Sequence, residues 1–363
     1  MQKVESYQPP VNSLPPIVLQ DLLRKPEGWP VGIQINVYNI LRIDTGGSQV
    51  FQASFIVKLT WYDEKYKDIP KDKTVKNLDD IELPRIQVMN AQEIDSFDIK
   101  LKACVGGLMF YQTRYKATIK ENFELQNFPF DYQPLHIRLR ATSSGQHLVF
   151  HESFRNGGDD PCKFEDSTLA DFEFQQPLTR IIFDNKKSRN ELTYQLVYKR
   201  ARSYYHSHVY LPLLILEFIT FTLALIDPAD GFADAINIIL ISLLTQIAFR
   251  LGLADILPKV SYLTLVDYYF LTNILYSLLL CIFEIIFFFV EKERDERIYY
   301  FLGLFGTWVL FNIIYFYILT HRKFTLEDCD RQLKLLAGKT NSITMKDVKF
   351  IKKEPKALEK KEK

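Results

Sequence analysis

Cysteine and net charge are both scarce in this 363-residue chain. The four cysteines, Cys104, Cys162, Cys281 and Cys329, show no spacing typical of a zinc knuckle. The 45 basic and 44 acidic residues nearly cancel, so no global field favours nucleic acid as a partner. Cys104 and Cys162 lie in the same half of the chain, and they could pair if that half is extracellular.

Enzyme motifs are missing as well. The sequence has no glycine-rich phosphate loop, no His-Glu-x-x-His helix and no nucleophile elbow. We therefore expect neither an enzyme nor a bound cofactor or metal. The first ten residues, MQKVESYQPP, lack the apolar segment of a signal peptide. Export of the first half of the chain would then need a signal that has already been removed.

Long apolar runs are confined to the second half. Four of them approach or exceed the roughly 20 residues that cross a bilayer as a helix. They cover residues 207–226, 234–256, 262–290 and 298–320. The second is the least apolar, because it contains Asn237, Gln246, Arg250 and Asp255. A buried helix of a soluble protein is the alternative for such a run, but the three stronger runs beside it favour a membrane span.

The first half has the alternation of strands. Apolar residues occupy every second position over 33–37, 51–61 and 135–139, as in strands with one buried face. A hairpin is predicted over 178–200, turning at 185–188. The sequence thus predicts an irregular segment (1–30), an all-β sandwich (31–202), a bundle of four transmembrane helices (203–320) and a basic tail (321–363).

The second predicted span carries one distinctive stripe. Steps of four and three residues along a helix place a polar or acidic residue at each end of an apolar row. The stripe comprises Asn237, Ile241, Leu244, Ala248, Leu251 and Asp255, with Asp234 just before it. A seam between packed helices is the alternative, but such a seam needs no acids at its ends. Several copies around an axis would enclose a pore with apolar gates and acidic rings, and the absence of Lys and Arg from 227–236 favours cations.

Arg250 lies off this stripe, because it is about 220° around the helix from Asn237. A charge within the membrane needs a partner. Asp267 lies at a similar depth on the third predicted span, so we expect an ion pair between Arg250 and Asp267.

Four motifs in order resemble the pentameric ligand-gated ion channel family, and more closely its prokaryotic members, including proton-gated ones. They are WYD at 61–63, FPFDYQPLHI at 128–137, LTYQLVYKR at 192–200 followed by Pro212, and QIAFRLGLADILPKVSYLT at 246–264. The likeness covers about 31–320.

The resemblance implies a homopentamer, in which each subunit meets identical copies. It also implies a multi-pass protein of the plasma membrane or bacterial inner membrane, with its N-terminal domain outside. The second helices would line the pore, and the partners would be membrane lipid, permeant cations and a small-molecule agonist or protons. An anion-selective channel of the same family and a membrane-anchored binding protein without conduction are the alternatives.

The resemblance further implies a junction that couples the two domains. Its residues would be Asp44, Phe128, Pro129, Phe130, Asp131, Arg200, Pro258 and Lys259. Animal receptors close the FPFD loop with a disulfide, and the corresponding positions here are Glu121 and Leu135. We therefore expect packing of Leu135 and Ile137 to hold this loop.

An agonist would bind between subunits beneath the hairpin. The candidate residues are Met89, Arg138, Arg140, Phe183, Lys186 and Lys187. Met89 and Ser143 or Ser144 fall where two aromatics of the family's binding site would be, which argues against acetylcholine-like agonists. Gln49 replaces an acid of a proton-gated relative, which weakens the case for protons.

Two weaker sites have ordinary alternatives. His206 and His208 would share a face on a strand and could then bind zinc or sense pH, but on a helix they diverge, and interfacial residues are the favoured interpretation. Asp159 and Asp160 could hold a divalent cation, but a solvated loop is the favoured interpretation.

Overall fold

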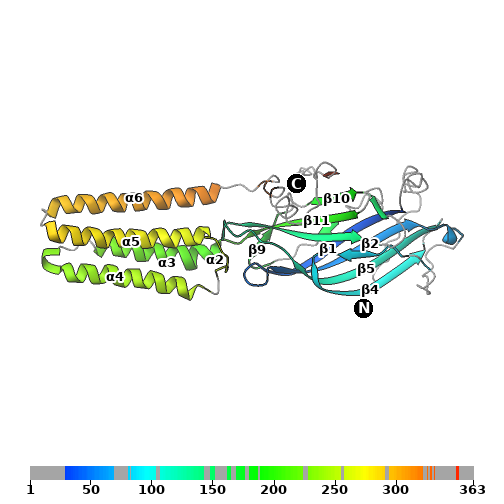
Figure 1. Cartoon of the computed structure of the whole chain (residues 1–363), viewed down its shortest axis with the longest axis horizontal. Coiled ribbons are helices and arrows are strands. Elements are labelled where there is room, and N and C mark those ends of the chain that lie inside the picture. Colours follow the sequence, from blue (N-terminus) through cyan, green and yellow to red (C-terminus); the bar gives the residue numbers. More distant parts are fainter. Residues whose placement is uncertain are drawn as a thin grey trace, which may run out of the picture.

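A computed structural model describes most of the chain. The described residues are 29–68, 81, 83–103, 107–142, 148–151, 162–164, 169–175, 180–186, 189–223, 228–254, 257–290, 294–321, 325, 328, 331 and 349–350. Figure 1 shows an elongated molecule with two sheets at one end and long helices at the other.

Antiparallel strands dominate the first half. In chain order the elements are β1 (Trp29–Asp44), β2 (Val50–Tyr62), the short helix η1 (Glu64–Tyr66), β3 (Ile86–Val88), β4 (Ala91–Ala103), β5 (Leu108–Lys120), β6 (Tyr132–Ala141), β7 (Leu148–His151), β8 (Cys162–Phe164), β9 (Phe172–Phe174), β10 (Arg180–Lys186) and β11 (Arg189–Arg200). One sheet has the order β4-β5-β2-β1-β7, with β8 also paired to β1. The other has the order β12-β10-β11-β6-β3, in which β12 is the short strand Lys349–Phe350, and β9 also pairs with β11.

Strand β2 shows why these residues form a sandwich. Its alternate residues from Phe51 to Trp61 are fully buried, whereas most residues between them are partly exposed. They face a core that also contains Leu135, Ile137 and Leu139 of β6. The alternation of the sequence therefore corresponds to one buried face on each sheet.

The second half is helical. It comprises α2 (Ser203–Tyr205), the π-helical segment η5 (His206–Tyr210), α3 (Leu211–Leu223), α4 (Pro228–Gly252), α5 (Leu265–Val290) and α6 (Arg294–His321). Pro228 begins α4, where its missing N–H costs nothing. Thr264 and Asp267 cap the start of α5 reciprocally, because Asp267 Oδ2 accepts from the Thr264 N–H at 2.9 Å and Thr264 Oγ1 accepts from the Asp267 N–H at 3.4 Å.

The helices return the chain to the sandwich. Helix α2 follows β11 directly, and near the end of α6 the ring of Phe316 lies 5.4 Å from that of Tyr210 and 6.0 Å from that of His206. A short strand, β12 (Lys349–Phe350), pairs with β10 of the sandwich. Both ends of the helical region therefore lie at its sandwich end (Figure 1).

The expectation of antiparallel β-sheets followed by apolar helices is confirmed. Among the described residues, three helices are long and apolar enough to cross a membrane, namely Phe232–Gly252, Leu265–Val290 and Ile298–His321. The first expected span, 207–226, is helical from Ser203 to Leu223, but 224–227 lie outside the described residues and α3 itself has 13 residues. A four-helix membrane bundle therefore stays a prediction.

Candidate functional site

The FPFD loop, residues 121–131 between β5 and β6, lies against the first helical turns. The ring of Phe128 meets Tyr205 edge-on with centroids 4.9 Å apart. The ring of Phe130 lies 5.6 Å from His206 and 6.0 Å from Tyr210. Both phenylalanines are buried, and the peptide bond between Phe128 and Pro129 is cis. The two aromatics thus form an apolar contact between the sandwich and the helices.

A buried ion pair lies beside these aromatics. Arg200 donates from Nε to Asp131 Oδ1 at 2.8 Å and from Nη2 to Asp131 Oδ2 at 3.1 Å. Asp131 is 2% exposed and Arg200 is 6% exposed. Burial by itself lowers the pKa of Arg200, but the charge and hydrogen bonds of Asp131 outweigh it and raise the pKa above its ordinary value.

Aromatic rings and hydroxyl groups, those of Thr45 and Tyr205, complete the surroundings of Arg200. Its guanidinium lies 4.8 Å from the ring centroid of Phe128 and 4.7 Å from that of Phe172. Its Nη2 also donates to Thr45 Oγ1 at 3.0 Å. Gln133 Nε2 donates to Asp131 Oδ2 at 2.5 Å. Both charges are therefore hydrogen-bonded within the sandwich, which is the condition for burying them at tolerable cost.

Asp44 lies at the junction but has hydrogen-bond partners of its own. It accepts from Ser48 Oγ at 2.6 Å and from the Gly46 N–H at 3.1 Å, and Arg42 lies 3.9 Å away. The Ser48 hydroxyl, more than any other contact, holds the pKa of Asp44 below its ordinary value. The hydrogen bond to Arg200 comes from its neighbour Thr45. Asp44 belongs to the junction as part of a cavity wall and not as a described partner of Arg200.

That cavity has a volume of about 370 Å³ and lies between the domains. Arg42, Asp44, Asp171, Arg200 and Pro258 are among the residues that line it. Pro258 comes from the connection between α4 and α5, and its neighbour Lys259 is exposed.

The FPFD loop also bonds to the connection between α4 and α5. The Leu125 N–H donates to the Tyr262 hydroxyl at 3.0 Å. The Leu265 N–H donates to the Gln126 carbonyl at 3.1 Å. The sequence did not predict these two contacts. A tyrosine hydroxyl or a backbone N–H can bond to many groups, and no sequence pattern indicates which one it meets. The loop consequently touches both the helix that follows the sandwich and the segment that follows α4.

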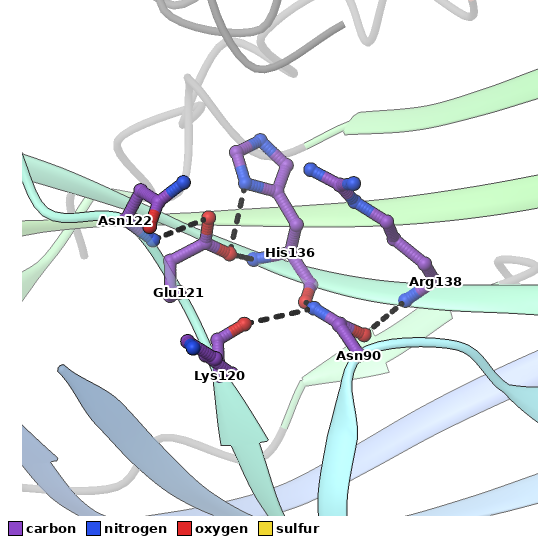
Figure 2. A network of polar contacts seen from close by, with 6 residues as sticks. All are labelled: Asn90, Lys120, Glu121, Asn122, His136 and Arg138. Atoms are coloured by element: carbon purple, nitrogen blue, oxygen red, sulfur yellow. Dashed lines mark hydrogen bonds and ion pairs between the residues drawn. The ribbon is translucent and has the colours of Figure 1, made fainter. Parts of the chain in front are cut away.

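A second buried pair closes the base of the FPFD loop (Figure 2). Glu121 Oε2 accepts from the His136 N–H at 2.9 Å and lies 3.1 Å from His136 Nδ1. Glu121 Oε1 accepts from the Asn122 N–H at 3.3 Å, and Asn90 Nδ2 donates to the His136 carbonyl at 2.7 Å. Glu121 is 4% exposed and His136 is fully buried. Leu135 and Ile137 are buried in the core, as the expected packing of this loop requires. The contact between Glu121 and His136 adds a polar interaction that also holds the loop.

Helix α4 has two contrasting faces. Ala235, Ile239, Ser242 and Gln246 are buried against the neighbouring helices. On the predicted stripe, Ile241, Leu244 and Leu251 are 63%, 66% and 71% exposed. The stripe residues Asp234, Asn237 and Ala248 are exposed too, whereas Asp255 lies outside the described residues. The stripe is therefore an uncovered face of the single chain.

Arg250 and Asp267 are in contact across α4 and α5. Arg250 Nη2 donates to Asp267 Oδ1 at 2.8 Å. The other carboxylate oxygen, Oδ2, accepts from Thr264 at the start of α5. One carboxylate thus caps α5 and holds α4 beside it.

The candidate agonist residues lie on or beside one sheet. Arg138 and Arg140 belong to β6, which pairs with β11, and Phe183 and Lys186 belong to β10, which pairs with β11 from the other side. The Met89 N–H donates to the Arg138 carbonyl at 2.8 Å. Arg140 donates to Glu191 Oε1 from both Nε and Nη2, so an ion pair already engages its charge. Lys187 lies outside the described residues, as do Asp159, Asp160, Ser143, Ser144 and Cys104.

The two histidines at the helix start have different neighbours. His208 stacks on Tyr204 with centroids 4.4 Å apart, while His206 faces Phe130, Tyr210 and Phe316. Their rings pack on separate aromatic groups, which favours the interfacial interpretation over a shared zinc site.

We expect Arg200→Gln to destabilise the sandwich by about 3–5 kcal/mol, because it leaves the Asp131 carboxylate buried without its cation. The neighbouring Lys199→Gln is the control: Lys199 pairs with Glu173 at 3.3 Å on the surface, and its loss should cost at most about 1 kcal/mol. Thermal unfolding of the purified protein, followed by the fluorescence of its tryptophans, including the buried Trp61, measures both. Equal effects of the two variants would contradict the assignment.

We expect Glu121→Gln to cost about 1–3 kcal/mol, because an amide keeps one acceptor oxygen and turns its NH2 donor toward either the His136 N–H or the Asn122 N–H, which then lacks an acceptor. Glu93→Gln, on an exposed position of β4, should change the stability by at most about 0.5 kcal/mol. Denaturant midpoints of the two variants compare them directly. A Glu121→Gln midpoint indistinguishable from that of the wild type would show that the pair does not stabilise the loop.

Comparison with known proteins agrees with the motifs. No protein-family model matches the chain. A curated relative, the proton-gated ion channel of Gloeobacter violaceus, is 24% identical over 269 residues, which cover 69% of this chain and 72% of the relative. The resemblance expected from the four motifs is thereby confirmed, because the chain is similar over most of its length to a proton-gated ion channel.

Proposed function

We propose that five copies of this chain form a cation-selective channel, which is opened by a small agonist or by protons acting on its extracellular sandwich. The observation that carries this proposal is the stripe on α4. Its apolar members are largely exposed, while the opposite face of the helix is buried against its own subunit. An exposed stripe with an acid and an amide at its start fits the wall of a water-filled pore.

The junction supports gating from the sandwich. Arg200 ends β11 three residues before the start of the first helix at Ser203, and its ion pair with Asp131 ties it to the FPFD loop. The same loop bonds to Tyr262 and Leu265 after α4. A movement of the sheet that contains β6 and β11 would therefore reach α4 through hydrogen bonds and packed aromatics.

The path of the chain supports four crossings with the sandwich and the tail on one side. The helical region begins beside the sandwich at Ser203 and comes back to it near Phe316. An even number of membrane crossings leaves the start and the end of the helical region on the same side. Four crossings would come from Ser203–Leu223, α4, α5 and α6. The sandwich would then be outside, as in the family.

The agonist site is proposed beneath the β10–β11 hairpin, between subunits. Arg138 of β6 would offer positive charge there, with Met89 as an apolar contact, while Arg140 is held by Glu191. A carboxylate or another small anion is the agonist that this charge favours. Protons are the second candidate, because the curated relative is named a proton-gated ion channel.

We expect Leu244→Ser to increase current at rest and to favour opening, because a hydroxyl wets the narrow apolar ring that gates by dewetting. The control is Leu310→Ser, which makes the same change at a 56% exposed leucine of α6. Recordings from purified protein in planar bilayers, with steps of pH and a panel of carboxylates and amines, give the readout. If both variants behaved alike, α4 would not line the pore. If no condition produced current while ligand bound, the chain would be a binding protein without conduction.

We expect Asp234→Asn to reduce the preference for cations, because the ring of carboxylates at the start of α4 is lost. Reversal potentials in asymmetric salt measure the ratio of cation to anion permeability. A wild-type reversal potential that follows the anion would establish the anion-selective alternative and overturn cation selectivity.

A further inference from the structure

Three helices meet at one buried carboxyl group within the membrane domain. Glu217 of α3, Gln246 of α4 and Ser277 of α5 are all fully buried. Glu217 Oε2 accepts from Gln246 Nε2 at 2.6 Å and from Ser277 Oγ at 2.8 Å. Gln246 Nε2 also lies 2.8 Å from Ser277 Oγ. We call these three residues the membrane triad.

The groups around the membrane triad are neutral or engaged elsewhere. On α3 and α4, Thr220 and Ser242 bond to each other at 2.5 Å. On α5 and α6, Trp308 donates to Asn273 and Tyr269 donates to Asn312. Arg250, the cation of α4, bonds to Asp267. Two further titratable groups of α5, Tyr269 and Glu284, are buried on the same helix. In the described helices, no Lys, Arg or His forms an ion pair with Glu217.

Two oxygens of the membrane triad lack a hydrogen-bond donor. They are Glu217 Oε1 and Gln246 Oε1, which belong to two side chains already in contact through their other polar atoms. Oxygens of an ionised carboxylate and of an amide are both acceptors, so neither can satisfy the other. A proton on Glu217 supplies the missing donor and removes the cost of an unpaired charge in an apolar region.

We propose that the membrane triad is a proton-binding site, in which Glu217 is a neutral acid while α3, α4 and α5 pack as described. Loss of this proton leaves a buried carboxylate on Glu217 whose two hydrogen-bond donors, Gln246 and Ser277, are neutral. The uncompensated charge weakens the packing of α4 against α3 and α5. Because α4 is the candidate pore helix, protonation of Glu217 biases the gate, a step that rests on the proposed function. Gln246 lies on the buried face, opposite the exposed stripe, so the site acts from behind the pore.

Infrared spectra of the full-length protein at neutral and alkaline pH test the site without any measurement of current. A protonated carboxyl group has a C=O stretching band that a carboxylate lacks. We expect such a band at neutral pH, its loss on alkalinisation, and its absence from Glu217→Gln at every pH. The matched control is Glu284→Gln, which removes the buried carboxyl group of α5 and should leave the Glu217-dependent band in place.

A second variant keeps the test informative if Glu217→Gln does not fold. Ser277→Ala retains the carboxyl group but removes the hydroxyl that donates to Glu217 Oε2. We expect it to move the band to higher frequency, because a C=O group that loses a hydrogen bond stretches at higher frequency. A spectrum that neither variant changes would overturn the proposal, since Glu217 would then be ionised throughout.

Current recordings separate the proton site from the channel. Glu217→Gln mimics the protonated state, so we expect it to remove the alkaline part of the pH dependence of the current. An infrared band that depends on Glu217, in a protein that never conducts, would sustain the proton site and reject the proposed channel. Conduction with a normal pH dependence in Glu217→Gln would reject the link between the site and the gate.

Discussion

The buried ion pair between Asp131 and Arg200 is the constraint on which the junction depends. Two charges that are 2% and 6% exposed are tolerable only if every polar contact around them is in place. Asp131 therefore requires the end of β11, and Arg200 requires the FPFD loop, Thr45 and the faces of Phe128 and Phe172. Because Arg200 lies three residues before Ser203, where the first helix begins, this requirement sets where that helix starts relative to the sandwich.

From this pair a continuous set of contacts leads to α4. The base of the FPFD loop is closed by Glu121 and His136, and its middle bonds to the connection after α4 through Tyr262. Asp267 then holds Arg250 at the end of α4. Each step is a hydrogen bond or a ring contact between residues of neighbouring elements. The sandwich and α4 are therefore connected by direct contacts, through which a displacement of one can move the other. The membrane triad also binds the buried side of α4 to its neighbours, through the hydrogen bond from Gln246 to Glu217.

Much of this architecture could be predicted from local patterns. The alternation from Phe51 to Trp61 predicted a strand with one buried face, and β2 buries that face. The four-three spacing of Ile241, Leu244 and Leu251 predicted one face of a helix, and these side chains are exposed together. The helical angle placed Arg250 away from that face, its depth in the span suggested Asp267 as its partner, and the two are in contact. These predictions were possible because each needs only the geometry of a single element and one neighbour.

Pairings between distant elements were decided by the tertiary structure alone. The amino-acid sequence alone was enough to predict the strands, the helices, their order and the family motifs, because periodicity and spacing are properties of the local chain. They did not reveal that Thr45 and not Asp44 bonds Arg200, or that Glu121 and His136 close the base of the FPFD loop. Nor did they join Glu217 to Gln246 and Ser277. Such contacts depend on strand register and helix rotation, which the packing of the whole core selects.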